Sequence, residues 1–217
     1  MRNPHSEKSL GAAKKIRFRD RIFFVFEEVY EPAEDTFLIA EHLKTSGHVL
    51  EIGTGCGILS ILAALQSDHV VATDINPQAV RCARLNAEIN GVSEKIDLLV
   101  GDLFSPLREN STFNVILFNA PYLPEEEREG CESKSLIDYA WSGGKDGRSI
   151  IDRFIQQAPE HLRPGGSILL VQSTLSDVEK TILEFRKRRL QAKIIAERKF
   201  LFESITLIEA VKPRRID

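Results

Sequence analysis

Short apolar runs alternate with amphipathic segments along most of the chain. The apolar runs predict strands at residues 48–51, 69–74, 96–100, 113–118 and 167–172, with two further β-rich segments at 193–196 and 205–211. The amphipathic segments predict helices at residues 34–44, 58–65, 77–89, 148–161 and 177–189. Because nearly continuous apolar strands alternate with helices, we expect an α/β fold whose mostly parallel sheet is covered by helices on both faces.

The ends of this pattern set the expected domain boundaries. Residues 1–15 are polar, and we expect a flexible tail there, whereas the alternating residues 16–30 predict a strand or hairpin. Arg163-Pro164-Gly165-Gly166 predicts the break between helix 148–161 and the strand that follows. The chain has 217 residues and 42% hydrophobic content, enough for one core, so residues 16–217 are expected to form a single domain.

Charge and cysteine usage narrow the classes of function. A net charge of -3 and a pI near 6.0 exclude the overall basic field of a nonspecific nucleic-acid binder, and we interpret the basic runs at 14–21 and 186–189 as solvated faces. The three cysteines form no C-x-x-C pair and the five histidines have no metal-ligand spacing, so we expect neither a metal site nor a disulfide framework. With no signal peptide or membrane-length apolar run, the sequence predicts a soluble cytoplasmic protein.

A glycine-rich loop, Gly53-Thr54-Gly55-Cys56-Gly57, joins the first predicted parallel strand to its helix. Glycines there let the backbone approach a ligand closely, and Asp74 ends the next strand 19 positions after Gly55, where an acid reaches ribose hydroxyls in dinucleotide folds. The nicotinamide fingerprint G-x-G-x-x-G fails, because it needs a glycine where this chain has Ile58. The loop therefore predicts a nucleoside-containing ligand of another kind.

Three carboxylates at successive strand ends point to the ligand's charge. Glu51, just before the loop, would repel phosphate and favour a cationic, phosphate-free ligand, a description that S-adenosylmethionine fits. Asp102, after the third strand, is placed to accept a hydrogen bond from an adenine amino group. Each acid alone could be a helix cap or loop residue, but the three together favour a binding site.

The stretch Phe118-Asn119-Ala120-Pro121-Tyr122-Leu123-Pro124 ends an apolar strand on a carboxamide. A turn could account for it, because Asn tolerates unusual backbone angles and Pro cannot continue a central strand. The glycine loop upstream favours the other interpretation, in which Asn119 and Tyr122 are held at the strand end for catalysis.

These residues resemble a class I S-adenosylmethionine-dependent methyltransferase. Asn119-Ala120-Pro121-Tyr122 is similar to the Asn-Pro-Pro-Tyr motif of amino-methyltransferases, with Ala120 in place of the first proline. Residues 30–37 (YEPAEDTF) and 141–148 (WSGGKDGR) resemble the HemK family of glutamine methyltransferases, and within it the eukaryotic–archaeal branch. Members of that branch methylate the glutamine of the GGQ loop in class-1 translation termination (release) factors. The resemblance covers nearly the whole chain beyond the basic N-terminal stretch.

The resemblance implies a seven-stranded Rossmann-like sheet with a final antiparallel strand, and it assigns roles to matching positions. It implies that the cofactor is bound by Thr36, Glu51, Gly53, Thr54, Gly55, Asp74, Ile75, Asp102, Leu103 and Asn119. The substrate would be bound by Asp35, Asn119, Ala120, Pro121 and Tyr122. The carboxamide oxygen of Asn119 and the carbonyl of Ala120 would accept both N–H bonds of the attacking amide, while Tyr122 supplies an aromatic wall.

Other acceptors and a partner follow from the same features. The exocyclic amine of adenine is also planar with two N–H bonds, so N6-adenine methylation of DNA is an alternative, as is protein lysine methylation; the acidic single domain has little spare chain for gripping a duplex. A scaffold with a relict site is the non-enzymatic alternative. The predicted strand 96–100 would be an apolar sheet edge, and the resemblance suggests a small zinc-binding activator subunit that adds a strand there.

Overall fold

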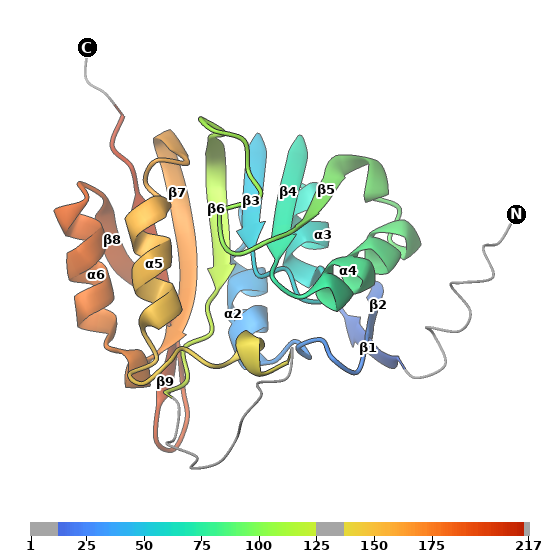
Figure 1. Cartoon of the computed structure of the whole chain (residues 1–217), viewed down its shortest axis with the longest axis horizontal. Helices are drawn as coiled ribbons and strands as arrows, with labels where there is room; N and C mark the ends of the chain where they lie inside the picture. Colours follow the sequence, from blue (N-terminus) through green and yellow to red (C-terminus); the bar gives the residue numbers. More distant parts are fainter. Residues whose placement is uncertain (1–12, 125–136, 215–217) are drawn as a thin grey trace, which may run out of the picture.

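A seven-stranded sheet is the centre of the fold. The computed structural model describes residues 13–124 and 137–214, with strand order β5-β4-β3-β6-β7-β9-β8 (Figure 1). The strands are β3 (His48–Ile52), β4 (His69–Asp74), β5 (Ile96–Val100), β6 (Phe113–Asn119), β7 (Leu162–Ser173), β8 (Gln191–Lys199) and β9 (Ser204–Val211). Only β9 runs antiparallel to its neighbours. The predicted mostly parallel sheet with a final antiparallel strand is confirmed.

Helices cover both faces of the sheet, as predicted. On one face lie α2 (Glu34–His42), α3 (Ile58–Ala64) and α4 (Pro77–Ile89), and on the other α5 (Ser149–Gln157) and α6 (Val178–Lys187). In Figure 1, α5 and α6 lie in front of the sheet, while α2 and α3 lie behind it. Short 3-10 turns are formed by η1 (Ser93–Lys95), η2 (Asp138–Ala140) and η3 (Thr174–Ser176). No helix among these described residues is long and apolar enough to cross a membrane.

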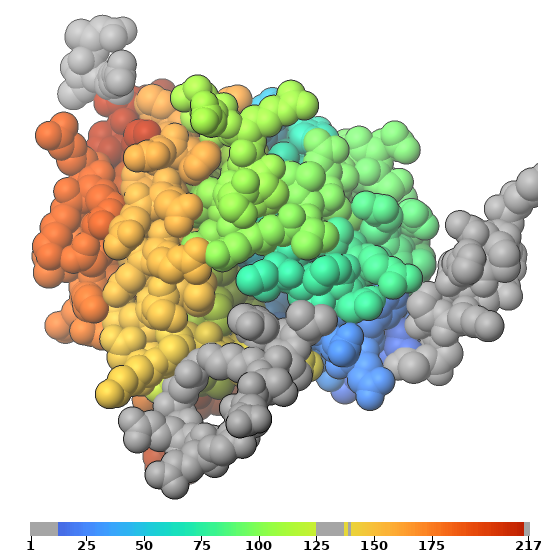
Figure 2. All heavy atoms as spheres, in the orientation of Figure 1, coloured from blue at the N-terminus to red at the C-terminus, as the bar shows by residue number. Residues whose placement is uncertain are grey.

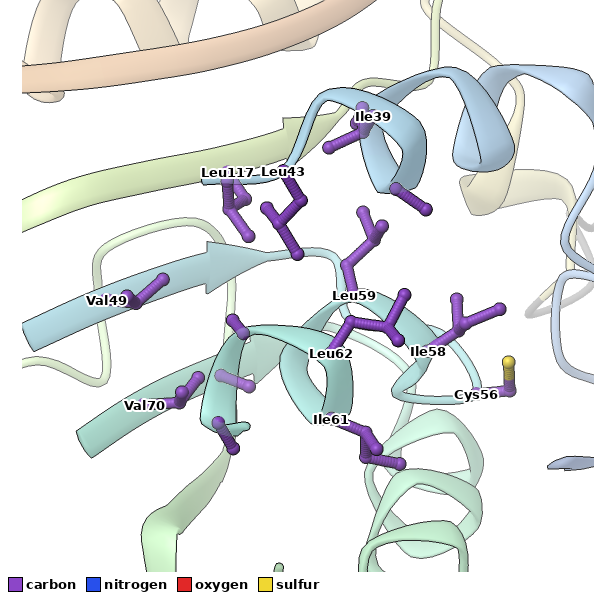
Figure 3. Packing of buried hydrophobic residues seen from close by; sticks show 14 of the residues in the cluster. Ile39, Leu43, Val49, Cys56, Ile58, Leu59, Ile61, Leu62, Val70 and Leu117 are labelled. Atoms are coloured by element: carbon purple, nitrogen blue, oxygen red, sulfur yellow. The ribbon is translucent and has the colours of Figure 1, made fainter. Parts of the chain in front are cut away.

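The strands are continuously apolar because each face has its own hydrophobic core. Val49 and Leu50 are both fully buried, and their side chains point to opposite faces, Val49 into the cluster under α2 and α3 and Leu50 into the cluster under α5 and α6. Figure 3 shows Leu43 of the segment after α2 and Leu59 of α3 meeting over the first of these faces. Both cores fix the sheet rigidly, so the strand ends are fixed as well.

The segment between β5 and β6 contains no helix and covers the second face with side chains. Phe104 is buried, and its ring stacks on Phe154 of α5 with 5.5 Å between centroids and on His161 with 4.7 Å. Figure 2 shows this segment, in green, filling the surface beside α5. Its first residues are thereby held against the carboxyl ends of β4 and β5.

Two predicted boundaries in the main sheet and its helices differ from the structure by four residues or more. Helix α5 ends at Gln157, and β7 begins at Leu162, so the Pro-Gly-Gly segment that was expected to break the chain lies inside the strand. The ladder accommodates it with an irregularity: Phe113 pairs with Leu162 and Val115 with Ser167, so β7 uses five positions where β6 uses two. The extra residues remain in the strand because tertiary pairing outweighs the local turn signal.

An N-terminal hairpin, β1 (Lys14–Phe18) and β2 (Arg21–Val25), confirms the strand or hairpin expected at 16–30. It begins at Lys14, two residues before the expected start at residue 16, and residues 1–12 lie outside the described residues. Asn86 of α4 fastens it: its side chain accepts from Phe24 N at 2.8 Å and donates to the carbonyls of Phe24 at 2.7 Å and Cys56 at 2.8 Å. The hairpin is thus attached to the glycine loop through one buried amide.

Candidate functional site

A cavity opens at the carboxyl ends of β3, β4, β5 and β6. It encloses about 1000 Å³ of space, part of which is open to solvent. All ten residues expected at a cofactor line it: Thr36, Glu51, Gly53, Thr54, Gly55, Asp74, Ile75, Asp102, Leu103 and Asn119. Pro121 also lines it, whereas Asp35, Ala120 and Tyr122 lie beside it. The structure therefore brings together the residues that the sequence singled out.

Asp74 organises the glycine loop from the end of β4. Its Oδ2 accepts from Gly55 N at 2.8 Å and its Oδ1 accepts from Asn76 N at 2.8 Å. Burial raises the pKa of Asp74, and these two backbone hydrogen bonds oppose the shift. Gly55 has φ +55°, and a Cβ there would meet nothing within 4 Å, so the backbone lies against open space. Each carboxylate oxygen keeps a lone pair for a ligand hydroxyl.

Glu51 is a buried carboxylate in the cavity wall. It is 2% exposed, and burial raises its pKa to about 8, although hydrogen bonds from Ser60 and Thr54 lower it. Thr54 Oγ1 donates to Glu51 Oε2 at 2.8 Å, and the Ser60 hydroxyl donates to the same oxygen. Ser60 was not anticipated from the sequence, because a serine inside a helix gives no sign of its partner. A cation bound here would offset the cost of ionising Glu51.

The loop after β5 contributes both backbone and side-chain groups to the cavity wall. Leu103 is buried at φ +49°, an unfavourable region for a non-glycine residue, and its carbonyl accepts from Thr73 Oγ1 at 3.2 Å. Asp102, expected to face an adenine amine, pairs with Arg153 of α5 and is about 41% exposed. Ile75, 46% exposed, presents an apolar surface at the cavity wall.

Asn119 ends β6 with one half of its amide bonded and the other half free. Its Nδ2 donates to Thr36 Oγ1 at 3.1 Å. Its Oδ1 is buried and has no hydrogen-bond partner among residues 13–124 and 137–214. A buried acceptor without a partner costs about 1–3 kcal/mol unless a ligand satisfies it. The carboxamide oxygen is therefore the atom of the cavity wall that most clearly lacks a donor.

Two tyrosines hold Asp35 beside Asn119. Asp35 Oδ2 accepts from Tyr30 Oη at 2.9 Å and from Tyr122 Oη at 3.3 Å. Burial, and then the Asp35 carboxylate, raise the pKa of both phenols, so both stay protonated and donate. Tyr30 was not predicted as a site residue; the only sign of it was its place at the start of the 30–37 segment.

Segment 141–148 holds the turn that follows Asn119. Leu123 N donates to Trp141 O at 2.9 Å, and Gly143 N donates to Leu123 O at 2.9 Å. Gly147 has φ +73°, and a Cβ there would lie 2.3 Å from Tyr122 O. The segment is fixed in turn by buried Arg148, which donates to Thr181 Oγ1 at 3.0 Å. These contacts explain why a segment so far along the chain belongs with the Asn119 turn.

Two further expectations concern metal ligands and the basic run at 186–189. No group of three His, Cys, Asp or Glu side chains that could hold a metal lies within the described ranges. The basic run is engaged locally, where Lys187 and Arg188 pair with Glu184 at 2.7 Å each and hold its pKa down at about 2. The acidic stretch 125–129 lies outside the described residues.

Comparison with known proteins relates the chain to methyltransferases. A family model described as "Methyltransferase small domain" matches residues 31–200. A putative protein N5-glutamine methyltransferase of Methanocaldococcus jannaschii is 43% identical over 188 residues, which cover 84% of this chain and 91% of that protein. Human methyltransferase HEMK2 is 31% identical, with 86% and 91% covered. A release factor glutamine methyltransferase of Geobacter sulfurreducens is 34% identical, but only 54% of its length is covered.

Solved structures give the same fold. The E. cuniculi Mtq2–Trm112 complex, described as responsible for methylation of the eRF1 translation termination factor, matches with a TM-score of 0.65 and 25% identity. The match covers 85% of this chain and 99% of that chain. A tRNA m1G37 methyltransferase of M. jannaschii has a TM-score of 0.65 at 18% identity, a likeness of fold alone.

Proposed function

We propose a function for this chain, which belongs to the methyltransferase small-domain family. In this proposal it transfers a methyl group from S-adenosylmethionine to the side-chain nitrogen of the GGQ glutamine in a class-1 translation release factor. The observation that carries the proposal is the buried Asn119 Oδ1, an acceptor without a donor at the cavity wall in the described part of the chain. Relatives named as glutamine methyltransferases, and a structural neighbour that acts on eRF1, support the choice of substrate. Such a substrate implies work in the cytoplasm.

The residues that line the cavity fit S-adenosylmethionine. Asp74 retains lone pairs for ribose hydroxyls, and Ile75 and Leu103 offer apolar surface and backbone for adenine. Glu51 needs a positive group beside it, because its burial otherwise favours the neutral acid. Asp102 would share its carboxylate between adenine and Arg153. When bound, the cofactor supplies an electrophilic methyl group on a sulfonium and leaves as S-adenosylhomocysteine.

The chain's own task is to orient a weak nucleophile. An amide nitrogen is poorly nucleophilic because its lone pair is delocalised into the carbonyl, so positioning and charge stabilisation must supply the rate. Asn119 Oδ1 accepts one N–H of the glutamine and the Ala120 carbonyl accepts the other, which aims the nitrogen at the cavity. Both acceptors stabilise the positive charge that develops on nitrogen. Tyr122 is no base, because its phenol is held protonated by burial and by Asp35, which raise its pKa; the nitrogen's proton leaves to water.

An apolar hairpin tip beside the site supports a protein substrate rather than DNA. At the turn between β8 and β9, Leu201 is 86% and Phe202 is 89% exposed, at the same sheet edge as the cavity. The turn is fixed to the site because Glu203 accepts from the Ser173 hydroxyl and lies close enough to raise the pKa of Tyr122. Apolar side chains at the sheet edge where the cavity opens suit a protein surface, whereas a duplex would need cations. We assign this tip to docking of the release factor.

The edge strand β5 is the proposed site of an activator subunit. It ends the sheet in the described part of the chain, and its last residue, Val100, is 51% exposed. The Mtq2 neighbour was solved as a complex with Trm112, and the family resemblance suggests a small zinc-binding partner that adds a strand at such an edge. Val100→Lys should weaken activation and binding, since a charge on an edge blocks strand addition. Ile194→Lys on the opposite edge strand is the matched control. A chain that is soluble, monomeric and fully active alone would count against the partner.

Mass spectrometry tests the proposed reaction. The chain, with and without a candidate activator, is incubated with S-adenosylmethionine and either a wild-type release factor or its GGQ Gln→Asn variant. We expect one methyl group on the GGQ glutamine and none on the variant. Duplex DNA and a lysine-rich protein are parallel acceptors. Methylated adenine or lysine, with no mass gain on the release factor, would replace this proposal by the corresponding alternative.

A further inference from the structure

We propose that Asp35 sets the direction of the Asn119 amide through the hydroxyl of Thr36, and that this relay makes the site select a glutamine amide over a glutamate carboxylate. Asp35 is thus a positioning residue in addition to any contact with substrate. The inference rests on the proposed function, because it concerns the group that Asn119 binds. It is carried by the hydrogen-bond pattern around three adjoining side chains of α2 and β6.

The relay begins at Asp35, which is surrounded by donors. Its Oδ1 accepts from Thr36 N at 2.6 Å and from Thr36 Oγ1 at 3.2 Å. Its Oδ2 accepts from the hydroxyls of Tyr30 and Tyr122. Four donors occupy the lone-pair directions of both oxygens, and the residue is only 5% exposed. Asp35 therefore acts as a carboxylate that only accepts.

Because Asp35 only accepts, Thr36 must donate its hydroxyl proton to it. A hydroxyl has one proton, and the proton of Thr36 is committed to Asp35 Oδ1, so its oxygen can only accept from any other neighbour. Thr36 is 4% exposed, which leaves little access for water to supply a competing donor. The side chain 3.1 Å away is Asn119, which must therefore present Nδ2, its donor half, to Thr36.

The orientation of Asn119 then determines what the site binds. With Nδ2 held by Thr36, Oδ1 faces away from Thr36 as a buried acceptor without a partner among the described residues. A flipped amide would oppose Oδ1 to the Thr36 oxygen, two acceptors with no proton between them. The unflipped amide accepts an N–H of glutamine and repels a carboxylate of the same shape. Discrimination of glutamine from glutamate thus originates at Asp35, two side chains away.

Paired Thr36 variants test the relay in the whole 217-residue chain, assayed with and without the proposed activator subunit. Thr36→Val removes the hydroxyl at nearly constant volume, and we expect kcat on a release factor to fall by about 10–100-fold. Thr36→Ser retains the hydroxyl and should keep most of the activity. Affinity for S-adenosylhomocysteine is measured in both variants, because Thr36 also lines the cavity, and kcat is compared at saturating cofactor so that weaker cofactor binding does not count as loss of the relay. Thr206→Val, another buried threonine, in β9, controls for the general cost of the substitution.

A binding ratio provides a readout that a purely structural role would not move. Inhibition of methylation by Gly-Gly-Glu and Gly-Gly-Gln peptides is compared in each variant. The wild type should prefer the glutamine peptide by about tenfold or more, and Thr36→Val should lose most of this preference because its amide can flip. An unchanged ratio and kcat in Thr36→Val, with an active wild type, would overturn the relay and leave the proposed function standing. A wild type inactive on the release factor would instead overturn the proposed function and this inference with it.

A reciprocal exchange covers the case in which Thr36→Val does not fold. Asn119→Asp places a second carboxylate, beside that of Asp35, against the single hydroxyl of Thr36, so the activity of this variant should be low. Adding Asp35→Asn removes the first carboxylate, and the Thr36 hydroxyl can then donate its proton to the carboxylate introduced at position 119. The double variant should be at least about tenfold more active than Asn119→Asp alone, because such coupling is expected only of residues in one hydrogen-bond network. Additive or greater loss in the double variant would contradict the relay.

Discussion

The backbone nitrogen of Gly55 donates a 2.8 Å hydrogen bond to Oδ2 of Asp74. The two residues lie at the ends of neighbouring parallel strands, so the bond closes the glycine loop of β3 onto the end of β4. Asp74 therefore shapes the loop as well as offering acceptors to a ligand, and both effects should change the affinity for the ligand when Asp74 is replaced.

Asp74→Ala should weaken cofactor binding by about 1–3 kcal/mol, since ribose hydroxyls lose their acceptor and Gly55 N loses its partner. Titration calorimetry with S-adenosylhomocysteine measures the change. Asp68→Ala is the matched control, because Asp68 is an exposed carboxylate before the start of the same strand. Unchanged affinity with the fold intact would remove Asp74 from the site, and tighter binding of a nicotinamide dinucleotide would contradict the whole cofactor assignment.

Glu51 should make both stability and cofactor binding depend on pH. Its pKa is raised from 4.5 to about 8 in the folded, ligand-free chain, so between these values the folded state holds a proton that the unfolded state has lost. Stability therefore falls as pH rises from about 4.5 to 8, by up to about 1.4 kcal/mol per pH unit, and Glu51→Gln should flatten this dependence. Denaturant unfolding at several pH values measures it. A wild type and a Glu51→Gln variant with parallel pH profiles would contradict the shift.

The same proton should be released when a cation binds. A positive group beside Glu51 favours its ionised form, so cofactor affinity should rise with pH up to the pKa of about 8. Calorimetry in buffers of different ionisation enthalpy should detect proton release near pH 7 for the wild type and less for Glu51→Gln.

The sequence predicted which residues meet at the strand ends better than it predicted the contacts that support them. Gly55 and Asp74 could be predicted because parallel strand ends meet at one edge, so strand periodicity alone brings them together. Ser60 and Tyr30 could not, since their contacts with Glu51 and Asp35 depend on packing that no local pattern specifies. The sequence singled out Gly147 only through the family resemblance. The need for a glycine there comes from the nearby carbonyl of Tyr122, a contact that only the folded structure reveals.

Gly147→Ala should damage catalysis more than cofactor binding. Its Cβ would lie 2.3 Å from Tyr122 O, so the turn after Asn119 must move, whereas the glycine loop and Asp74 lie on other strands. We expect kcat to fall by about 10²-fold, the effect of a misplacement near 1 Å. Gly91→Ala is the control: it has a similar φ, +70°, but a Cβ there meets nothing within 4 Å. Equal loss of activity in both variants would attribute the effect to backbone strain alone.

Phe202→Asp should raise KM for a release factor without changing cofactor affinity. Its ring is 89% exposed at the hairpin tip, so the substitution costs the free chain little but places a charge in the proposed docking surface. We expect an increase of about tenfold or more, as for an aromatic contact at an interface. Leu183→Asp, at an exposed position of α6, is the control. Steady-state kinetics with the whole factor, and with a short GGQ peptide that cannot reach the tip, separate docking from chemistry; equal effects on both substrates would contradict the assignment.

Asn119→Ala is the most direct test of the reaction. It removes the buried acceptor at the end of β6, and the loss of one such transition-state partner costs about 10²–10³-fold in turnover. The proposed cofactor contacts lie chiefly on β3, β4 and the loop after β5, so affinity for the cofactor should change much less, a pattern that marks an interaction made in the transition state. Asn114→Ala is the matched control: Asn114 lies in the same strand, but its Oδ1 is occupied by His48 N at 2.9 Å, so its replacement should reduce stability rather than turnover. Single-turnover methylation of a release factor, combined with calorimetry for the cofactor, distinguishes the two effects. Full turnover by Asn119→Ala would show that the free carboxamide oxygen plays no part in methyl transfer.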